Sequence, residues 1–243
     1  MRKAAIIYRR ELGAYLKSPT GYIVSAAVLL IQGILFYTQA LGPRGGARLS
    51  GEVLSHFFMW ASGPTAVGAL VLSLRLVAQE RQTGSLVLLN TSPVREAEVV
   101  AGKFFAAFTF LAGATLLSFY LPMLILVNGK ISLAHVVAGY SGLLLFGAAC
   151  LAIGMFATAV APDQLIAAVV GGILTAALYF AYYLAKEMSP PLRGVFEGIA
   201  IWHKHYWPFM RGIVHLQHVV YYLAIIYFFL VLATKTLEAR RWR

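Results

Sequence analysis

The sequence is poor in charge and nearly free of cysteine. Only 12% of its 243 residues are Asp, Glu, Lys or Arg, and 60% are hydrophobic, whereas about a quarter of the residues in soluble domains are charged. No hydrophilic stretch is long enough to fold in water, so residues 1–243 are expected to form a single membrane domain. The one cysteine, Cys150, lies in an apolar run, which excludes a disulfide framework and favours a packing role.

Acidic residues are scarcer than basic ones, and the formal net charge is +11. The basic residues stand at the ends of apolar runs and form no soluble patch with interleaved aromatic residues. This arrangement argues against nucleic acid as a partner and favours the anionic headgroups of membrane lipids.

Six apolar stretches are long enough to cross the hydrocarbon core of a bilayer, which takes about 20 helical residues. The sequence therefore predicts an all-α integral membrane protein with six transmembrane helices. None of these stretches contains Asp, Glu, Lys or Arg, which argues against a proton- or ion-coupled transporter. The predicted spans are Gly21 to Leu41, Val53 to Leu74, Phe104 to Val127, Ile131 to Val160, Gln164 to Ala185 and Ile213 to Thr234.

Lys and Arg residues are unevenly distributed between the two sides of these spans. They are more frequent in the N-terminal segment, the connection between the second and third spans, and the C-terminal tail than in the other connections. By the positive-inside rule, both termini of this multi-pass protein are predicted to be cytoplasmic.

The N-terminal segment, residues 1–19, has the pattern of an amphipathic helix that lies along an anionic membrane surface. Its polar face carries Lys3, Arg10 and Lys17, and Ser18-Pro19 ends it. Its apolar face carries Ala5, Tyr8, Leu12, Tyr15 and Leu16. The alternative is an irregular basic leader with no role at the membrane surface.

Motifs for nucleotide or metal binding are missing. Gly102-Lys103 is followed by Phe104 and Gly129-Lys130 by Ile131, so no phosphate-binding loop is present and the chain is not expected to hydrolyse ATP by itself. The pairs His203-x-His205 and His215-x-x-His218 have no cysteine and only a distant Glu197 to complete a metal site. No bound cofactor or metal is expected.

One motif is typical of an enzyme. Gly139-Tyr140-Ser141-Gly142 resembles the serine turn of rhomboid intramembrane proteases, for which His215 or His218 would be the base. Small residues in a membrane helix also serve close packing. A rhomboid-like membrane enzyme and a membrane scaffold are therefore alternatives to a transporter.

The connection over residues 79–93 differs from a plain polar loop. It has a charged pair, Glu80-Arg81, then Gly84, one apolar helical turn, and Ser92-Pro93. This pattern predicts a short helix held against another surface, followed by a new helix that Ser92 caps. Glu96 and Glu98 would lie near the positive end of that helix.

The same connection resembles the coupling segment of type-2 ABC transporter (ABC-2) permeases, in the run Glu80-Arg81-x-x-Gly84-Ser85-Leu86-x-x-Leu89-x-x-Ser92-Pro93. Two further runs are similar to gliding-motility-associated, GldF-like permeases. They are Arg10-Glu11-Leu12-x-x-Tyr15-x-x-Ser18-Pro19-x-x-Tyr22, and the segment from Phe209-x-Arg211-Gly212 through Tyr221-Tyr222 to Arg240-Arg241-Trp242. The resemblance covers essentially the whole chain.

This resemblance implies a permease subunit without catalytic residues, in the bacterial inner membrane. It would pair with a second permease subunit and with cytoplasmic ABC ATPase subunits, which would hold the ATP and magnesium. Residues 1–19 would be the elbow helix, with Arg10, Glu11, Tyr15, Ser18 and Pro19 as its marker residues. The ATPase would dock on the coupling helix, whose marker residues are Glu80, Arg81, Gly84, Ser85, Leu86, Leu89, Ser92 and Pro93.

On the opposite side, residues 187–217 are rich in aromatic side chains, including Trp202, Tyr206 and Trp207, and contain Arg211. Trp and Tyr favour the headgroup level, which predicts a re-entrant or surface-lying segment. By the resemblance, this face would gate release or contact an extracytoplasmic accessory protein. An interfacial anchor is the alternative. The substrate is not indicated by any of these patterns.

Overall fold

The computed structural model describes residues 2–40, 51–76, 95–128 and 131–241. The described residues form helices and no strands, so the predicted all-α fold is confirmed. The helices are α1 (Arg2–Lys17), α2 (Pro19–Leu35), the π-helical turn η1 (Phe36–Ala40), α3 (Gly51–Ser73), α6 (Glu96–Leu117), α7 (Tyr120–Asn128), α8 (Leu133–Val160), α9 (Gln164–Glu187), α10 (Leu192–Ile199), α11 (Trp207–Met210) and α12 (Leu216–Arg241).

Five segments of the described chain are long and apolar enough to cross a membrane. They are Pro19–Thr38, Glu96–Ile125, Leu133–Val160, Gln164–Glu187 and Leu216–Arg240. Helix α3, the predicted second span, is 23 residues long but is absent from this set. It contains His56, Pro64 and several Ser and Gly residues, which lower its hydropathy.

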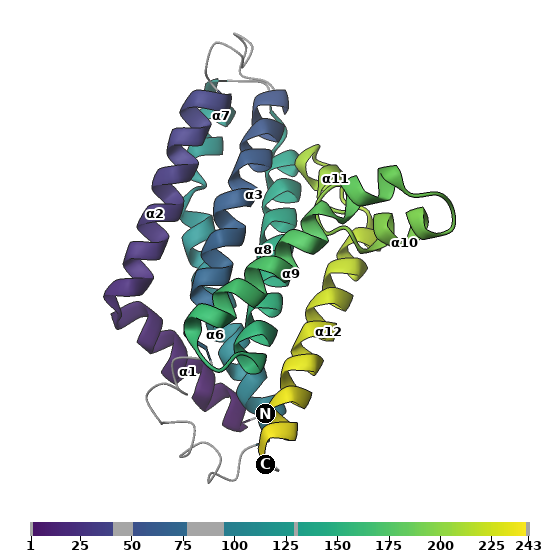
Figure 1. The fold of residues 1–243 in the computed structure, drawn as a ribbon. Coiled ribbons are helices and arrows are strands. Elements are labelled where there is room, and N and C mark those ends of the chain that lie inside the picture. The colour runs from purple at the N-terminus through teal and green to yellow at the C-terminus, as the bar shows by residue number, and fades with distance from the viewer. Residues whose placement is uncertain (1, 41–50, 77–94, 129–130, 242–243) are drawn as a thin grey trace.

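Helix α3 packs against α2 and α8 inside the bundle, and Figure 1 shows it between α2 and α9. Its polar Ser62, Thr65 and Ser73 are buried, and Thr65 Oγ1 accepts a hydrogen bond of 3.2 Å from the Gln32 amide of α2. Because these groups have partners within the protein, α3 needs less hydropathy than a helix surrounded by lipid.

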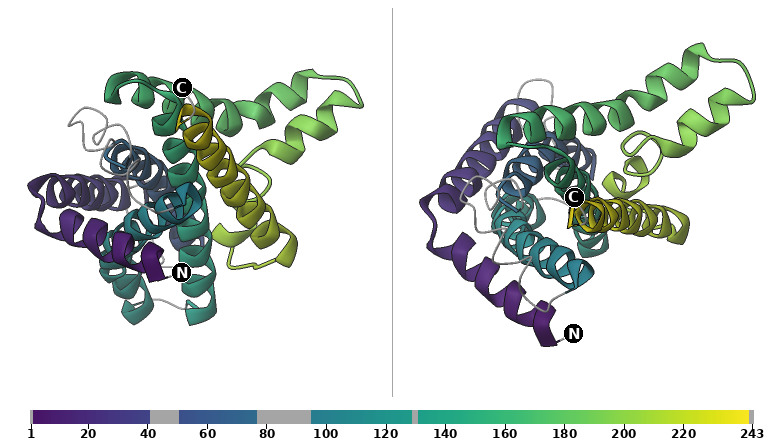
Figure 2. Two further views of the ribbon diagram at one scale, coloured as in Figure 1. Left: turned by 90° about the horizontal axis from the view of Figure 1, so that it is seen from below. Right: turned by 60° about the horizontal axis from the view of Figure 1, so that its bottom comes forward.

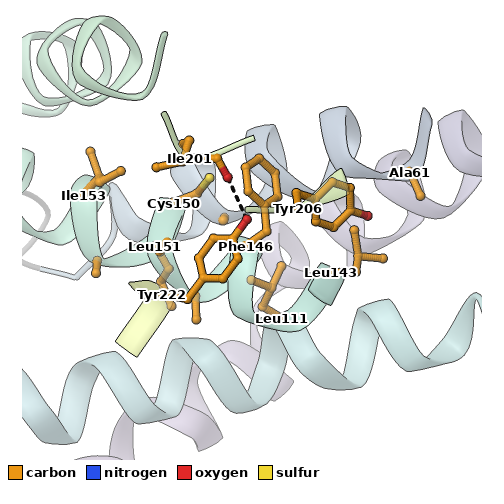
Figure 3. Packing of buried hydrophobic residues seen from close by; sticks show 14 of the residues in the cluster. Ala61, Leu111, Leu143, Phe146, Cys150, Leu151, Ile153, Ile201, Tyr206 and Tyr222 are labelled. Atoms are coloured by element: carbon orange, nitrogen blue, oxygen red, sulfur yellow. Dashed lines mark hydrogen bonds between the residues drawn. The ribbon is translucent and has the colours of Figure 1, made fainter. Parts of the chain in front are cut away.

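Helix α8 is the central element, since 78% of the residues in its most apolar 18-residue stretch are buried within the protein. Its glycines permit close approach: a Cβ at Gly139 would lie 2.0 Å from Phe58, and one at Gly142 would lie 2.4 Å from Cβ of Phe209. Cys150 is fully buried in the same helix. Figure 3 shows it among the packed side chains of this core, as its apolar context predicts.

The ends of two helices follow from their capping residues. The Ser132 hydroxyl accepts from the backbone N–H of Ala134 at 3.2 Å, and the Asp163 carboxylate accepts from that of Ile166 at 2.9 Å. These caps begin α8 and α9 because the first N–H groups of a helix have no partner within it. The predicted third span is divided between α6 and α7, which are separated by Ser118 and Phe119.

Both termini lie at the same end of the bundle (Figures 1 and 2). Helices α10 and α11 lie toward the opposite end, where α9 and α10 extend sideways from the bundle. The chain therefore has a terminal end, where α1 lies, and a cap end, formed around α10 and α11.

Candidate functional site at the junction of α1, α3 and α6

The predicted coupling residues lie outside the described residues. Glu80, Arg81, Gly84, Ser85, Leu86, Leu89, Ser92 and Pro93 all belong to residues 77–94. The described chain stops at Leu76 after α3 and resumes at Arg95 before α6. The candidate site is therefore built from the elements that flank this segment on both sides, and from α1, which contacts both.

Helix α1 is joined to α6 by an ion pair at low exposure. Glu11 Oε1 lies 3.4 Å from Lys103 Nζ, and their side chains are 14% and 1% exposed. The same carboxylate oxygen accepts a hydrogen bond of 2.6 Å from Arg10. Burying a lysine side chain costs free energy unless it is paired, so the contact between Glu11 and Lys103 favours this register of α1 on α6.

Helix α1 is joined to the end of α3 through Tyr15. The Tyr15 hydroxyl donates to the carbonyl oxygen of Leu72 at 2.9 Å, in the last turn of α3, where carbonyl groups lack helical partners. Its ring stacks on Phe110 of α6 with 5.4 Å between centroids. Burial raises the pKa of the Tyr15 hydroxyl, so the group remains a donor.

The turn between α1 and α2 is fixed by Arg75, which follows α3. Its guanidinium donates to the Ser18 hydroxyl at 2.7 Å and lies 5.9 Å from the centre of the Tyr15 ring. Ser18 is extended and Pro19 begins α2. A Cβ at Gly21 would lie 2.6 Å from the Tyr15 carbonyl oxygen, so the sharp bend requires glycine at that position.

The predicted apolar face of α1 is divided between two environments. Of its predicted residues, Tyr15 is buried and Tyr8 and Leu12 are half-buried, whereas Ala5 and Leu16 are exposed. Outside the predicted face, Ile7 is buried and Ile6 is 65% exposed. One side of α1 therefore contacts the protein, and an exposed apolar strip remains beside the basic residues. This division fits a helix at a membrane surface that also contacts the bundle.

Helix α6 begins at Glu96 with Arg95 as its N-cap, so the prediction that Ser92 caps this helix is wrong. Glu98 explains the difference, because its carboxylate accepts from the backbone N–H of Arg95 at 3.4 Å and closes the first turn. Glu96 and Glu98 do lie in that turn, near the positive end of the helix as predicted.

At the cap end, the predicted aromatic residues act mainly as buried anchors. The Tyr206 hydroxyl donates to the carbonyl oxygen of Phe58 at 2.9 Å, and Trp202 Nε1 donates to the Ser62 hydroxyl at 3.0 Å. Tyr206 is fully buried and Trp202 is 6% exposed. The protein itself buries these two rings against α3, so within the described chain they are anchors of the cap and not exposed surface residues.

Trp207 and Arg211 lie nearer the surface. Trp207 is 37% exposed, and the Arg211 guanidinium stacks on its ring at 5.1 Å from the ring centre. The cap is also joined to α12, since the Tyr222 hydroxyl donates to the carbonyl oxygen of Ile201 at 2.7 Å (Figure 3). The four predicted residues thus belong to one packed unit on α3, α9 and α12.

The comparison with protein families finds one model that matches residues 5–233, described as an ABC-2 family transporter protein. The match covers almost the whole chain, from within α1 to within α12. The chain belongs to the ABC-2 transporter family. No curated protein matches the sequence. Family membership makes the chain a membrane subunit of an ABC transporter and implies an ABC ATPase as partner.

This ABC-2 subunit gives no support to the protease alternative. The Ser141 hydroxyl donates to the carbonyl oxygen of Ala138 in its own helix at 2.7 Å, and His218 is bonded to His205. Within the described chain, no hydrogen bond joins Ser141 to a histidine. Gly139 and Gly142 serve packing against Phe58 and Phe209.

No cluster of three or more His, Cys, Asp or Glu side chains suited to a metal ion occurs in the part of the ABC-2 subunit that the structure describes.

The sequence indicated parts of the junction but missed its centre. Hydropathy predicts Lys103 to be the boundary before a span that starts at Phe104, because a lysine lowers local hydropathy. The structure places it inside α6, with Glu11 as its partner. The predicted elbow residues Arg10, Glu11, Tyr15 and Ser18 do meet at this junction.

Proposed function

We propose that this chain is the permease subunit of an ATP-driven transporter, moved by a separate ATPase that binds residues 79–93. The observation that supports this most directly is the junction. Helix α1 is bonded both to the end of α3 and to the start of α6, the two helices that flank residues 77–94. Force applied to that segment would therefore reach α1 and the bundle together.

We infer six membrane crossings, with α3 as the additional one. Helix α2 leaves the terminal end of the bundle, and the last turn of α3 returns there, where Leu72 accepts from Tyr15. Helix α3 therefore runs along the bundle beside α2 (Figure 1). Without its crossing, the five apolar segments would leave the termini on opposite sides of a membrane, whereas both lie at one end.

The terminal end is proposed to face the cytoplasm. It carries the basic residues of α1, together with Arg75, Lys235 and Arg240 near the helix ends, and cytoplasmic loops are enriched in such residues. In this orientation, α1 is the elbow helix at the inner surface of the membrane. Its exposed Ile6 and Leu16 would contact lipid there.

The junction of α1, α3 and α6 is suited to transmit motion because its hydrogen bonds and ion pair are buried or nearly so. Each of its bonds joins residues far apart in the sequence: Tyr15 to Leu72, Ser18 to Arg75, and Glu11 to Lys103. A displacement of α3 against α6 would have to move α1 or break these bonds. The helices are also closely packed at this junction, since a Cβ at Gly102 would lie 2.9 Å from the Ala4 carbonyl oxygen.

The remaining assignments rest on the resemblance. We propose a second permease subunit, a location in the bacterial inner membrane, and membership of the GldF-like subgroup. ATP and magnesium would bind to the ATPase subunits. The cap over residues 187–217 would contact an extracytoplasmic accessory protein, and the exposed residues of α10, including Leu192 and Val195, are available for this contact.

Co-purification tests the proposal. The tagged chain, extracted from native membranes in mild detergent, should bring down a protein with a phosphate-binding loop, identified by mass spectrometry. The variant Glu80→Ala with Arg81→Ala should lose this partner. The matched control is Arg193→Ala with Glu197→Ala, which removes an exposed ion pair on α10 and should retain it. Equal recovery of the ATPase with both variants, or no ATPase with the wild type, would refute the docking site.

A further inference from the structure

Two histidines face each other in the buried contact between the cap and α12. His205 Nδ1 lies 3.0 Å from His218 Nδ1, and the residues are 8% and 4% exposed. His205 belongs to residues 200–206, which follow α10, and His218 lies in the first turn of α12. The pair therefore joins two elements at the end of the bundle opposite the termini (Figure 1).

The partners of the two rings determine where their hydrogens lie. His205 Nε2 is 3.3 Å from the carbonyl oxygen of Gly198, and a carbonyl only accepts, so Nε2 carries a hydrogen. The neutral ring then has an accepting Nδ1, to which His218 Nδ1–H donates. His218 Nε2 in turn accepts from the side-chain amide of Gln217 at 3.3 Å. This chain of bonds is complete when both rings are neutral.

The surroundings disfavour an additional proton. The His205 ring stacks on Tyr221 with 3.5 Å between centroids, and the apolar ring of Phe209 on α11 lies beside His218. Lys204 is the neighbouring cation, and His215 lies 5.7 Å from His218 between ring centroids. The carboxylate of Glu197 on α10 is paired with Arg193. Burial lowers the pKa of His205 to about 4, with smaller contributions from His218 and Lys204.

Protonation of His205 would break this arrangement. Its Nδ1 would then carry a hydrogen opposite the Nδ1–H of His218, and two donors would oppose each other without an acceptor. A proton taken up by His218 would instead bind Nε2, which faces Gln217, and would leave the bond between the two Nδ1 atoms in place. We propose that the His205–His218 pair is a proton-sensitive clasp, which holds the turn at His205 against the first turn of α12 while His205 Nδ1 is unprotonated and releases that turn when Nδ1 takes up a proton. The bond of the Tyr222 hydroxyl to Ile201 keeps the start of residues 200–206 attached, so the opening is local. The clasp does not depend on the proposed ATPase coupling.

Pulsed electron paramagnetic resonance on the full chain in lipid nanodiscs tests the clasp. Spin labels at Val195→Cys on α10 and Val220→Cys on α12 occupy exposed positions, and buried Cys150 stays in place. Chelator is present throughout, so that no metal ion bridges the rings. The distance distribution should be narrow at about pH 7.5, and broader and longer at about pH 4. In His218→Gln it should stay narrow at both, because an amide can either donate to or accept from His205 Nδ1.

A control pair at Leu165→Cys on α9 and Tyr227→Cys on α12 occupies exposed positions away from the clasp. Its distance distribution should not change with pH. An unchanged wild-type distribution, or an equal change in His218→Gln, would overturn the proposal. A second measurement uses only the wild-type sequence. Nitrogen-15 NMR of labelled histidines at about pH 7.5 should find His205 protonated at Nε2 and His218 at Nδ1, and finding both at Nε2 would also overturn it.

Discussion

Replacing Tyr15 with phenylalanine tests whether a side-chain bond fixes α1 to α3. Tyr15 is 4% exposed, and its hydroxyl donates to the Leu72 carbonyl oxygen at 2.9 Å. The substitution removes one buried hydrogen bond and keeps the ring on Phe110. The Leu72 carbonyl retains the backbone N–H of Arg75 at 3.4 Å, so it is not orphaned. We therefore expect a loss of about 1 kcal/mol in the free energy of unfolding.

Cys150 provides the assay for Tyr15→Phe, because it is the one cysteine in the chain and is fully buried. A thiol-reactive fluorogenic dye should label it only on unfolding, so a thermal ramp in detergent reads the midpoint directly. About 1 kcal/mol corresponds to a decrease of roughly 2–4 °C for a chain of this size. Tyr15→Ala, which also removes the buried ring, should cost about 3–5 kcal/mol.

Tyr22→Phe is the matched control for this experiment. The Tyr22 hydroxyl also donates to a backbone carbonyl, that of Leu16 at 2.6 Å, but the residue is 59% exposed. Water replaces such a bond, so the change should stay within about 0.5 kcal/mol. Equal midpoints for Tyr15→Phe and Tyr22→Phe would refute the claim that α1 is fixed by a buried bond.

Three further predictions concern the same unfolding midpoint. The first two use the dye assay, and the third follows unfolding by circular dichroism, because the dye reacts with the thiolate and labels little at low pH. Gly142→Ala places a Cβ 2.4 Å from Cβ of Phe209 and should cost about 1–3 kcal/mol by overpacking; a midpoint at or above that of the wild type would contradict this. Trp202→Phe and Ser62→Ala each remove the same 3.0 Å bond, so their combined cost should fall about 1 kcal/mol short of the sum, whereas full additivity would show that the bond contributes nothing. Burial lowers the pKa of His205 to about 4, below the ordinary value of about 6.5, so the neutral His205 ring contributes its full stability above about pH 6.5 and loses it toward pH 4. The unfolding midpoint should therefore fall over that range, and it should fall less in His205→Asn. Equal decreases in both proteins would contradict this prediction.

Hydropathy predicts much of the fold because lipid imposes strict local requirements on a helix. The predicted fifth span starts at Gln164, as α9 does, and in the structure Asp163 caps this helix. The start of α6 is not predicted correctly, because Glu96, Glu98 and Lys103 lower local hydropathy over its first turns. Lys103 is tolerated inside the helix only because Glu11, distant in sequence, is folded against it.

The candidate site was less accessible to sequence reasoning, for a related physical reason. The bond of Trp202 to Ser62 joins residues 140 positions apart, and periodicity contains no information on such pairs. Trp and Tyr occur both at membrane interfaces and as buried hydrogen-bonded anchors, so composition alone does not separate the two roles. The coupling role of residues 79–93 came from the family resemblance, while the pattern itself predicted only a short bound helix.

Site-specific photo-crosslinking in native membranes tests the central claim most directly. A photoreactive amino acid is placed at Leu86, in the predicted coupling segment, and in a separate protein at Val195, which is 58% exposed on α10 at the cap end. The permease assignment predicts that Leu86 crosslinks to a phosphate-loop ATPase and that Val195 does not. Failure of Leu86 to capture an ATPase, together with labelling of that position by a membrane-impermeant reagent from outside the cell, would contradict it.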